Sequence, residues 1–364
     1  MPTSSTPTLD PQQLKTLAAD IKNWGNELGF QHVGISDTEL SKAEATLLNW
    51  LDHGYHGDME WMARHGSKRS RPQELVPGTL RVISVRLDYL PEPAQDCIDL
   101  LTQPTLAYIS RYALGRDYHK LLRKRLQQLA NKILTVTGEL GFRVFVDSAP
   151  VLEKAIAEKA GLGWIGKHTN LLQKQTGSWF FLGELYVGLP LPVDVPAQNH
   201  CGTCTSCLDV CPTNAFIAPY KLDARKCISY LTIENKGAIP EEFRAQMGNR
   251  IYGCDDCQLF CPWNRFAEQT GEKDFKPRHN LNNIELLHLF NWSEKEFLDN
   301  LQGSAIRRIG YDAWLRNIAV ALGNALAANP NNLEIKQALS TRLNTVSDLV
   351  REHIQWALDI QPTN

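Results

Sequence analysis

The sequence predicts a chain of mixed class, with an N-terminal α/β or α+β domain, a small cysteine-rich domain and an all-helical C-terminal domain. Three observations support this prediction. Helical and strand patterns alternate over residues 11–191, eight of the nine cysteines lie between Cys201 and Cys261, and short amphipathic segments follow from about Glu285. The proline-rich run LPLPVDVPAQ (189–198) indicates a linker. We therefore expect domains at residues 1–192, 193–280 and 281–364.

Hydrophobic periodicity predicts the elements of the first domain in order. Apolar residues at three- and four-residue spacing predict helices, and short runs rich in β-branched and aromatic residues predict strands. The expected order is a helix at 11–28, a strand at 30–35, a helix at 40–51, strands at 81–90 and 106–113, a helix at 117–136, a strand at 141–147, a helix at 148–161 and a strand at 178–191. The pattern leaves the strand order open and allows a hairpin around Gly183 in the last strand.

The C-terminal segments predict short amphipathic helices separated by turn-forming NP, NN and NTVS sequences. These helices are expected at ELLHLF (285–290), KEFLDNL (295–301), DAWLRNIAVALGNALA (312–327), EIKQALSTRL (334–343) and DLVREHIQWAL (348–358). Such a series resembles helical-repeat units stacked in pairs.

The composition argues against several classes of protein. The chain is 43% hydrophobic, enough for a sizeable core, and its formal net charge of −2 excludes a uniformly basic nucleic-acid binder but not a local basic patch. No apolar run reaches the roughly 18 residues of a membrane span, and the N-terminal MPTSSTPTLDPQQLK resembles no secretory or twin-arginine signal. We expect a cytoplasmic protein without a membrane partner, whose cysteines form no disulfide framework.

The cysteine spacing is the most specific signal in the chain. Cys201, Cys204, Cys207 and Cys211, followed by Pro212, match the bacterial ferredoxin run C-x2-C-x2-C-x3-C-P, in which the fourth cysteine ligates the other cluster. A second group completes the set with Cys227, Cys254, Cys257 and Cys261, and Pro262 follows it. The spacing predicts a ferredoxin-like domain with two [4Fe–4S] clusters.

The eight thiolates divide into two ligand sets. We expect the first cluster on Cys201, Cys204, Cys207 and Cys261, and the second on Cys211, Cys227, Cys254 and Cys257. The alternative is a pair of zinc sites, but zinc usually prefers paired C-x2-C knuckles to a triple run that ends in CP. Cys97 is left over and is expected to be an ordinary semi-buried cysteine.

Two such clusters would conduct electrons to another site. The α/β region before them is expected to hold a cofactor for one-electron chemistry, since a bare ferredoxin needs far fewer residues. No G-x-G-x-x-G follows a predicted strand and opens a helix, so a dinucleotide-binding fingerprint is missing.

Long stretches of the chain resemble the epoxyqueuosine reductase family. They are HGDMEWM (56–62), RPQELVPG (71–78), SRYALGRDYHK (110–120), VDSAPVLEKAIAEKAGLGWIGKHTNLL (146–172), the eight cysteines and RIGYDAWLRNIAVALGN (308–324). The resemblance implies a cobalamin in the N-terminal domain and a C-terminal HEAT-like repeat domain that helps to hold tRNA. It also implies reduction of the epoxide of epoxyqueuosine, at the wobble position of the anticodon loop, to the alkene of queuosine.

Asp147 is the candidate proton donor for the departing oxygen. It ends the predicted strand GFRVFVD, where α/β sheets place ligands, and the resemblance points to the same position. The alternative is a helix N-cap ahead of Pro150. Lys154 is expected near the substrate or cofactor, or else in an exposed ion pair with Glu153 or Glu158.

Three segments are candidates for the cofactor pocket. The glycine-rich loop AGLGWIGKHTN (160–170) would let backbone approach a flat macrocycle, although Gly161 also suits a helix C-cap. The tract SRYALGRDYH (110–119) and the basic loop RHGSKRSR (64–71) are expected nearby, the latter on phosphates or else solvated. The cofactor-binding candidates are Arg69, Ser110, Arg111, Tyr112, Asp147, Lys154, Gly163, Trp164, Lys167, Asn170 and Leu171.

The tRNA-binding candidates lie in RRIGYDAWLRN (307–317). Arg307, Arg308 and Arg316 are expected to contact phosphates, while Trp314 and Ile318 fit the core of a helix pair. The alternative is that all three arginines are solvated.

Three other interpretations of the clusters remain open at this point. One is a corrinoid reductive dehalogenase, which the missing twin-arginine signal and the helical tail argue against. A second is a ferredoxin-type electron-transfer module, and a third is a nucleic-acid binder with structural clusters. For the reductase we expect a low-potential donor such as ferredoxin or flavodoxin, and a monomer, since nothing in the sequence indicates an interface.

Overall fold

The computed structural model describes residues 9–139 and 141–360. By its internal contacts the chain divides into two compact units. The first comprises residues 1–54, 60–88 and 118–204, and the second residues 55–59, 89–117 and 205–364. Residues 89–117 thus belong with the C-terminal half, whereas we expected them in the first domain. The boundaries expected near residues 192 and 280 stay predictions.

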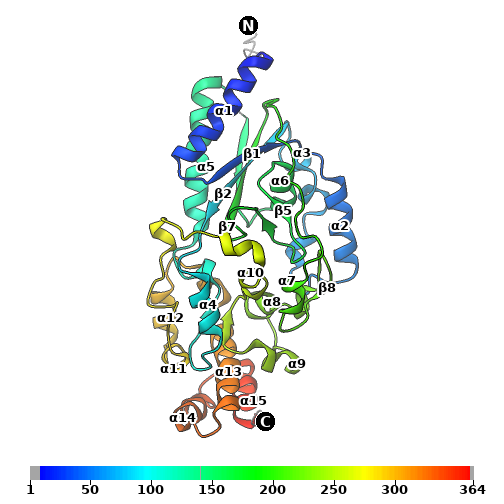
Figure 1. Ribbon diagram of the computed structural model, residues 1–364. Coiled ribbons are helices and arrows are strands. Elements are labelled where there is room, and N and C mark those ends of the chain that lie inside the picture. Colours follow the sequence, from blue (N-terminus) through cyan, green and yellow to red (C-terminus); the bar gives the residue numbers. More distant parts are fainter. Residues whose placement is uncertain (1–8, 140, 361–364) are drawn as a thin grey trace. The chain divides into compact units, whose positions relative to one another are not determined.

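A four-stranded sheet in the order β1-β2-β7-β4 forms the centre of the first unit (Figure 1). The strands are β1 (His32–Ser36), β2 (Arg81–Asp88), β7 (Phe180–Val187) and β4 (Phe142–Phe145). All three neighbouring pairs are antiparallel. The sheet is therefore that of an α+β fold, and Asp147 does not lie at the carboxyl edge of a parallel sheet, where its place after a strand had predicted it.

Helices pack on both faces of this sheet. They are α1 (Pro11–Glu27), α2 (Ser41–Asp52), α3 (Pro72–Leu75), α5 (Tyr118–Thr137) and α6 (Glu153–Lys159). Gly183 of β7 faces α5, because a Cβ there would lie 2.8 Å from Leu126 Cδ1. Gly34 of β1 faces α6, where a Cβ would lie 2.1 Å from Ala160 O. Side chains alternate along a strand, so Glu184 lies on the α6 face.

Several element boundaries differ from those expected. Helix α6 begins at Glu153, five residues later than the start expected at 148, and ends before Gly161, whose φ of +78° fits the predicted C-cap. Strand β7 is continuous, and Gly183 pairs with Val85 instead of forming a hairpin. The strand expected at 106–113 shortens to β3 (Tyr108–Ile109).

The second unit is mainly helical. Its helices are α4 (Ala94–Leu101), α7 (Ser206–Asp209), α8 (Ile228–Ile233), α9 (Glu241–Arg244), α10 (Asp256–Leu259), α11 (Leu286–Phe290), α12 (Glu294–Asn300), α13 (Tyr311–Ala328), α14 (Leu333–Arg342) and α15 (Asp348–Asp359). Its strands are β3, β8 (Phe216–Ala218), β9 (Lys221–Leu222) and β10 (Arg250–Tyr252), and β3 pairs with β10 in parallel. The five C-terminal helices confirm the segments expected from residue 285 on.

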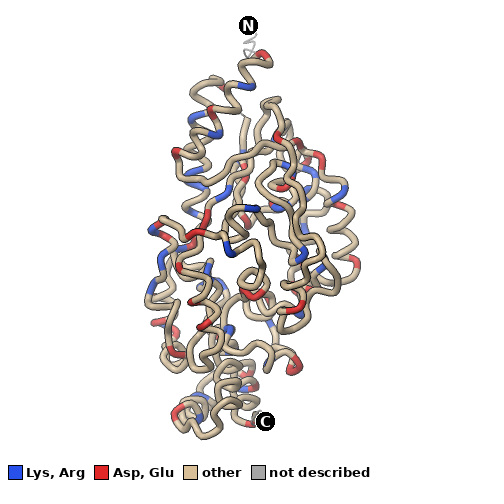
Figure 2. Tube along the Cα trace, in the orientation of Figure 1, with Lys and Arg blue, Asp and Glu red and all other residues tan. Residues whose placement is uncertain are grey.

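Helix α13 organises the core of this unit. Trp314, Ile318 and Leu322 are fully buried in a cluster that also contains residues of α11, α12, α14 and α15. A helix that is apolar on most sides must be covered on most sides, as α13 is. In the described part of the chain, none of the helices is long and apolar enough to cross a membrane. Figure 2 shows basic and acidic positions mixed along the trace, in keeping with the net charge of −2.

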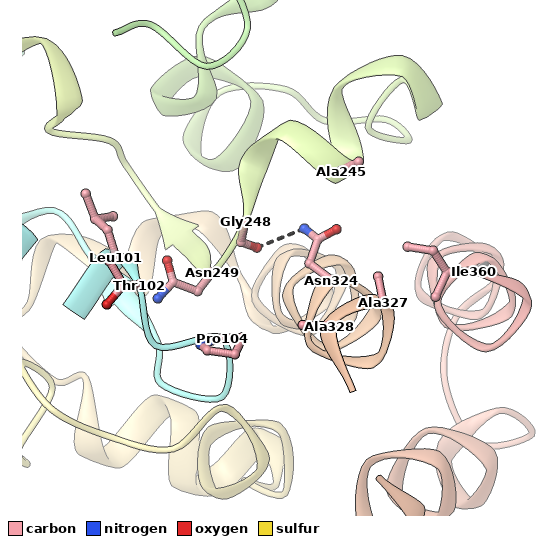
Figure 3. A pocket seen from close by; sticks show the side chains of 10 residues that line it. All are labelled: Leu101, Thr102, Pro104, Ala245, Gly248, Asn249, Asn324, Ala327, Ala328 and Ile360. Carbon is pink, nitrogen blue, oxygen red and sulfur yellow. Dashed lines mark hydrogen bonds between the residues drawn. The ribbon is translucent and has the colours of Figure 1, made fainter. Parts of the chain in front are cut away.

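A cavity of about 370 Å³ lies in the second unit between α4, α13 and the end of α15. Asn324 and Asn249 line it (Figure 3), but both use their side-chain amides on the backbone. Asn324 Nδ2 donates to Arg244 O and Gly248 O at 2.9 Å each, and Asn249 Nδ2 donates to three carbonyls. These amides therefore fix the surrounding backbone.

Candidate active site

Asp147 lies in a tight turn between β4 and α6. Its φ of +47° is in the left-handed region, which non-glycine residues adopt rarely and Asp more readily than most. The N–H of Asp147 donates to Glu153 Oε1 at 2.6 Å. Since α6 begins at Glu153 with Leu152 at its N-cap, the alternative that Asp147 caps this helix is wrong.

The carboxyl group of Asp147 is accessible and lies beside a histidine. Its side chain is 57% exposed, and Oδ2 lies 3.2 Å from Nε2 of His119 at the start of α5. The neighbouring Tyr118 ring stacks on Phe181 of β7, with 3.8 Å between ring centroids. This stacking fixes the first turn of α5 and so places His119 beside Asp147.

Two further carboxyl groups lie behind this turn. Glu184 of β7 is 0% exposed, and within the described residues neither of its carboxylate oxygens meets a hydrogen-bond donor. Its carboxyl lies against that of Glu153. Burial, with the neighbouring negative charges, raises the pKa of Glu153 to about 7 and the pKa of Glu184 well above its ordinary value. Sequence reasoning missed this pair, although a single Glu inside the apolar strand FFLGELYV is a signal that could have found it.

The glycine-rich loop forms a small hairpin of β5 (Trp164–Ile165) and β6 (Leu171–Leu172). A Cβ at Gly163 would lie 2.1 Å from Leu172 O, so this glycine is required for the hairpin's own packing. Lys154 Nζ donates to Thr169 O at 2.8 Å, so Lys154 supports the tip of the loop. Because Thr169 O is a backbone carbonyl, this contact differs from the ion pairs with Glu153 or Glu158 that were the alternative for Lys154.

The same loop supports the first two cysteines. Trp164 Nε1 donates to Cys201 Sγ at 3.4 Å, and the indole is only 2% exposed. Lys167 Nζ donates to Gly202 O at 2.7 Å and Cys204 O at 2.8 Å. Trp164 and Lys167, predicted as cofactor contacts, thus position the cysteine segment in this structure. Asn170 accepts a hydrogen bond from Gly166 N through its backbone O, and Leu171 is buried in β6.

The cysteines of the second unit lie in short turns and helices. Ala215 N donates to Cys211 Sγ at 3.3 Å, and Cys227 is the N-cap residue of α8. Burial raises the pKa of the Cys227, Cys254 and Cys257 thiols. Metal binding would deprotonate them, as it does for thiolate ligands in general. The segment between Cys227 and Cys254 returns to the cysteines through α8, α9 and β10, as the stretched spacing required.

The tract at 110–112 forms a buried polar network. Ser110 Oγ donates to Asp255 Oδ1 at 2.6 Å, and Arg111 N donates to Asp255 Oδ2 at 2.9 Å. The Arg111 guanidinium is fully buried and pairs with Glu92. Tyr112 OH donates to Tyr252 OH at 3.2 Å. The side chains of Ser110 and Arg111 are therefore committed to internal partners within the second unit.

The basic loop at 64–71 has fewer side chains available to bind phosphate than its sequence indicated. Arg69 is only 4% exposed and donates to Trp61 O and Met62 O at 2.7 and 3.1 Å. Arg71 forms ion pairs with Glu44 and Glu74 at 2.9 and 3.0 Å. The expectation of a dense phosphate-gripping loop is therefore wrong for these two residues, whereas Arg64 and Lys68 are exposed.

The three arginines predicted for tRNA divide into two groups. Arg307 and Arg308 are exposed, and Arg308 pairs with Glu234 at 2.6 Å. Arg316 is 0% exposed and donates to the carbonyls of Leu231, Asn235 and Gly237. The prediction of a surface position for Arg316 is wrong, because this guanidinium satisfies buried backbone acceptors.

Comparisons with known proteins agree with the cysteine motif. The family model for a 4Fe-4S double cluster binding domain matches residues 200–264, and the model described as epoxyqueuosine reductase QueG, DUF1730, matches residues 69–148. The match therefore favours an iron–sulfur domain in this segment over a pair of zinc sites. The epoxyqueuosine reductase of Pseudomonas aeruginosa is 63% identical over 352 residues, which cover 96% of each chain.

Solved structures show the same fold. A crystal structure of epoxyqueuosine reductase with an epoxyqueuosine-modified tRNA-Tyr stem loop matches with a TM-score of 0.79 and 26% identity, over 94% of this chain and 98% of that one. The Bacillus subtilis enzyme, described with its aspartate-bearing catalytic loop swung out of the active site, matches with a TM-score of 0.80 and 25% identity, over 95% and 99% of the chains. The chain belongs to the epoxyqueuosine reductase family.

Proposed function

We propose that this chain reduces epoxyqueuosine in a tRNA anticodon loop to queuosine. Both carbon–oxygen bonds of the epoxide break, an alkene forms, and two electrons and two protons release the oxygen as water. The family membership supports the reaction, as does the solved relative with an epoxyqueuosine-modified stem loop. The observation that carries the site assignment is the accessible carboxyl of Asp147, on a left-handed turn between His119 and Glu153.

In this proposal Asp147 is the proton donor. A departing epoxide oxygen needs a proton in the transition state, and a positioned carboxylic acid can supply it. The carboxyl must therefore be protonated before the carbon–oxygen bond breaks. His119, which contacts Asp147 Oδ2 and is 24% exposed, can exchange protons with solvent and restore the acid after each transfer.

We infer the two cluster ligand sets given by the cysteine spacing. Cys201, Cys204, Cys207 and Cys261 would hold one [4Fe–4S] cluster, and Cys211, Cys227, Cys254 and Cys257 the other. The thiol donors fit such clusters, and the N–H groups of Trp164 and Ala215 donate to cysteine sulfurs, as N–H groups do around iron–sulfur sites. When bound, the clusters supply electrons one at a time.

We also infer a cobalamin in the first unit, beside Asp147. His168 supports this inference, because its Nδ1 accepts from Asn170 N at 3.1 Å and Nε2 then carries a hydrogen that has no acceptor among the described residues. Burial lowers the pKa of His168 to about 4, so this donor is neutral and suits an amide of the macrocycle's rim. When bound, the group supplies low-potential cobalt for reduction at carbon. Gly163, Asn170 and Leu171 would contribute to the cobalamin site through the hairpin of β5 and β6, to which they belong.

For the tRNA we propose contacts from Arg307 and Arg308. Both lie in the turn before α13, and exposed arginines favour phosphates over other nucleic-acid groups. The helices α11 to α15 would form the HEAT-like repeat domain that presents them. The electron donor would be a reduced ferredoxin or flavodoxin. The enzyme would be a monomer, and it would lie in the cytoplasm, where tRNA is modified and thiol ligands stay reduced.

The test is turnover of an epoxyqueuosine-containing tRNA by the anaerobically reconstituted protein, with product nucleosides measured by mass spectrometry. About eight irons and one cobalt per chain are expected in the active protein. Asp147→Asn should retain the metals and lose at least about 100-fold in rate. Asp58→Asn, a change at an exposed carboxylate of the second unit, is the matched control. Full activity of Asp147→Asn would remove the proton-donor assignment.

A further inference from the structure

We propose that the hairpin of β8 and β9, with the turn that follows it, is the docking surface for the electron donor, an acidic one-electron carrier protein. This β8–β9 surface comprises residues 217–221 and 225–226, all of which belong to the second unit. The inference deepens the proposed function, because it rests on the two [4Fe–4S] clusters and names the place where electrons enter the second of them.

The β8–β9 surface lies between two ligands of the proposed second cluster. Cys211 lies just before β8, and Cys227 directly follows the 3-10 turn Ala224–Lys226. Hydrogen bonds hold both cysteines against this segment, since Ala215 N donates to Cys211 Sγ at 3.3 Å and Cys227 N donates to Ala224 O at 2.9 Å. Electron transfer slows steeply with distance. A carrier that docks on this surface would therefore deliver its electrons close to the second cluster.

The tip of the hairpin exposes apolar side chains. Ile217 is 41% exposed and Tyr220 is 42% exposed, and the two residues between them are exposed as well. Single apolar residues scattered over a surface are ordinary, whereas several at one tip are typical of an interaction surface. The apolar tip therefore fits the centre of a protein contact.

Tyr220 has a backbone conformation that does not favour an aromatic residue. Its φ of +66° lies in the left-handed region, which glycine and asparagine adopt readily and bulky residues rarely. The turn of the hairpin itself therefore does not require a tyrosine. Positions of this kind cluster at functional sites, and an exposed ring at this tip suits a contact with a partner.

Positively charged groups border the apolar tip. Lys221 Nζ lies 5.2 Å and Arg225 Cζ lies 5.6 Å from the centroid of the Tyr55 ring, so both cations lie on one aromatic side chain. Arg225 pairs with Asp223, but the aspartate side chain is 5% exposed and that of the arginine 51%, so the pair presents its positive end to solvent. Lys221 and Lys226 are partly exposed and form no ion pair among the described residues.

These charges determine the chemistry of the partner. In residues 212–226, Asp223 is the single acidic residue, against three basic ones. The whole chain has a net charge of −2 and would not attract an acidic protein, so a local positive surface is needed to orient one. An acidic carrier with an apolar contact near its redox centre complements both the cations and the tip. The contact is small, as in other transient redox complexes.

The first experiment measures reduction of the clusters in the absence of tRNA. Anaerobic holoprotein would be mixed with a reduced acidic flavodoxin in a stopped-flow instrument, and the loss of cluster absorbance would be followed at several salt concentrations. The second-order rate constant of the wild type should fall as salt screens the opposite charges. Lys221→Glu should lower it about tenfold at low salt and weaken its salt dependence. The matched control Lys336→Glu, at an exposed lysine of α14, should behave as the wild type.

The second experiment separates docking from the clusters and from the turn. Dithionite is a small reductant that needs no docking surface, so it should reduce Lys221→Glu as fast as the wild type. Tyr220→Asn keeps a residue that adopts the left-handed turn and removes the ring. Its melting temperature should stay within about 2 °C of the wild type, while flavodoxin should reduce its clusters several-fold more slowly. Reduction by flavodoxin at the wild-type rate would contradict the role of the apolar tip.

Equal flavodoxin rates in Lys221→Glu and Lys336→Glu would overturn the docking surface. An equal loss of rate with dithionite would also overturn it, because the effect would then lie in the clusters. Weaker tRNA binding by Lys221→Glu with an unchanged flavodoxin rate would assign the surface to RNA instead. Failure of the proposed function is separable, because it would show as a protein whose clusters are fully reduced but which converts no epoxyqueuosine, whatever these variants show.

Discussion

Replacing Arg316 by Met tests the finding that this arginine is structural. The guanidinium is 0% exposed and donates to Leu231 O at 2.8 Å, Asn235 O at 2.8 Å and Gly237 O at 2.7 Å. Burial lowers the pKa of Arg316 to about 10, so it remains charged at neutral pH. Methionine fills much of the same volume but offers no donor.

The cost follows from the acceptors left behind. Gly237 O keeps a second donor, Asn235 Nδ2 at 3.3 Å, and Asn235 is only partly buried and can be rehydrated. Leu231 O and Asn317 Oδ1, which accepts from Arg316 Nη2 at 2.9 Å and Nε at 3.1 Å, are left buried without these donors. At about 1–3 kcal/mol for each buried unsatisfied group and less for a rehydrated one, the loss should be about 3–6 kcal/mol. For a folding unit of this size, that lowers the melting temperature by roughly 10–20 °C.

The assay is thermal unfolding of the anaerobic holoprotein, followed by circular dichroism. Arg307→Met is the matched control, since Arg307 is exposed and nearby, and its melting temperature should change by less than about 1 °C. An Arg316→Met protein as stable as the wild type, but with weaker tRNA binding, would refute the reasoning and restore Arg316 to the tRNA surface.

Three other predictions follow from the contacts. Lys167→Met removes both hydrogen bonds to the Cys201–Cys204 segment, so iron should be lost to a chelator several-fold faster than from Lys174→Met, a control at an exposed lysine. Burial lowers the pKa of His353 to about 4, so the unfolded chain binds a proton that the folded chain does not, and the free energy of unfolding should fall by up to about 3 kcal/mol as the pH drops from about 6.5 towards 4. In chemical denaturation at several pH values, His353→Gln should reduce this dependence of the free energy of unfolding on pH. An unchanged dependence in the variant would contradict the prediction. Arg307→Ala should weaken tRNA binding and reduce the log–log salt slope by about 1 without changing the melting temperature, whereas an unaltered slope would exclude a phosphate contact.

The sequence was most informative where the determinants are local. The cysteine spacing specified a double-cluster segment because each ligand turn is only a few residues long, and the C-terminal helices followed from their apolar periodicity. The capping box of Asp10 and Gln13, with Pro11 after it, likewise starts α1 where the pattern predicted. Such signals need no knowledge of distant neighbours.

The misplaced residues depend on distant partners. Arg316 was expected on the surface because its acceptors are backbone carbonyls of residues about 80 positions earlier, which leave no mark in a side-chain pattern. The sheet order was open because β7 joins β2 to β4 across about 100 and 40 residues of chain. A helix cap at Asp147 was a possible prediction because Pro150 suits the start of a helix, but α6 begins only at Glu153. The carboxyl pair arises only when β7 and α6 come together.

The electron balance of the reaction decides whether this chain is a two-electron reductase. Anaerobic protein would be mixed with a limiting, titrated amount of a low-potential reductant and excess epoxyqueuosine-containing tRNA, and queuosine would be counted by mass spectrometry. One queuosine, lighter than its precursor by a single oxygen atom, is expected for every two electrons supplied. Electrons consumed without queuosine, or queuosine formed without reductant, would contradict a two-electron reduction by this chain.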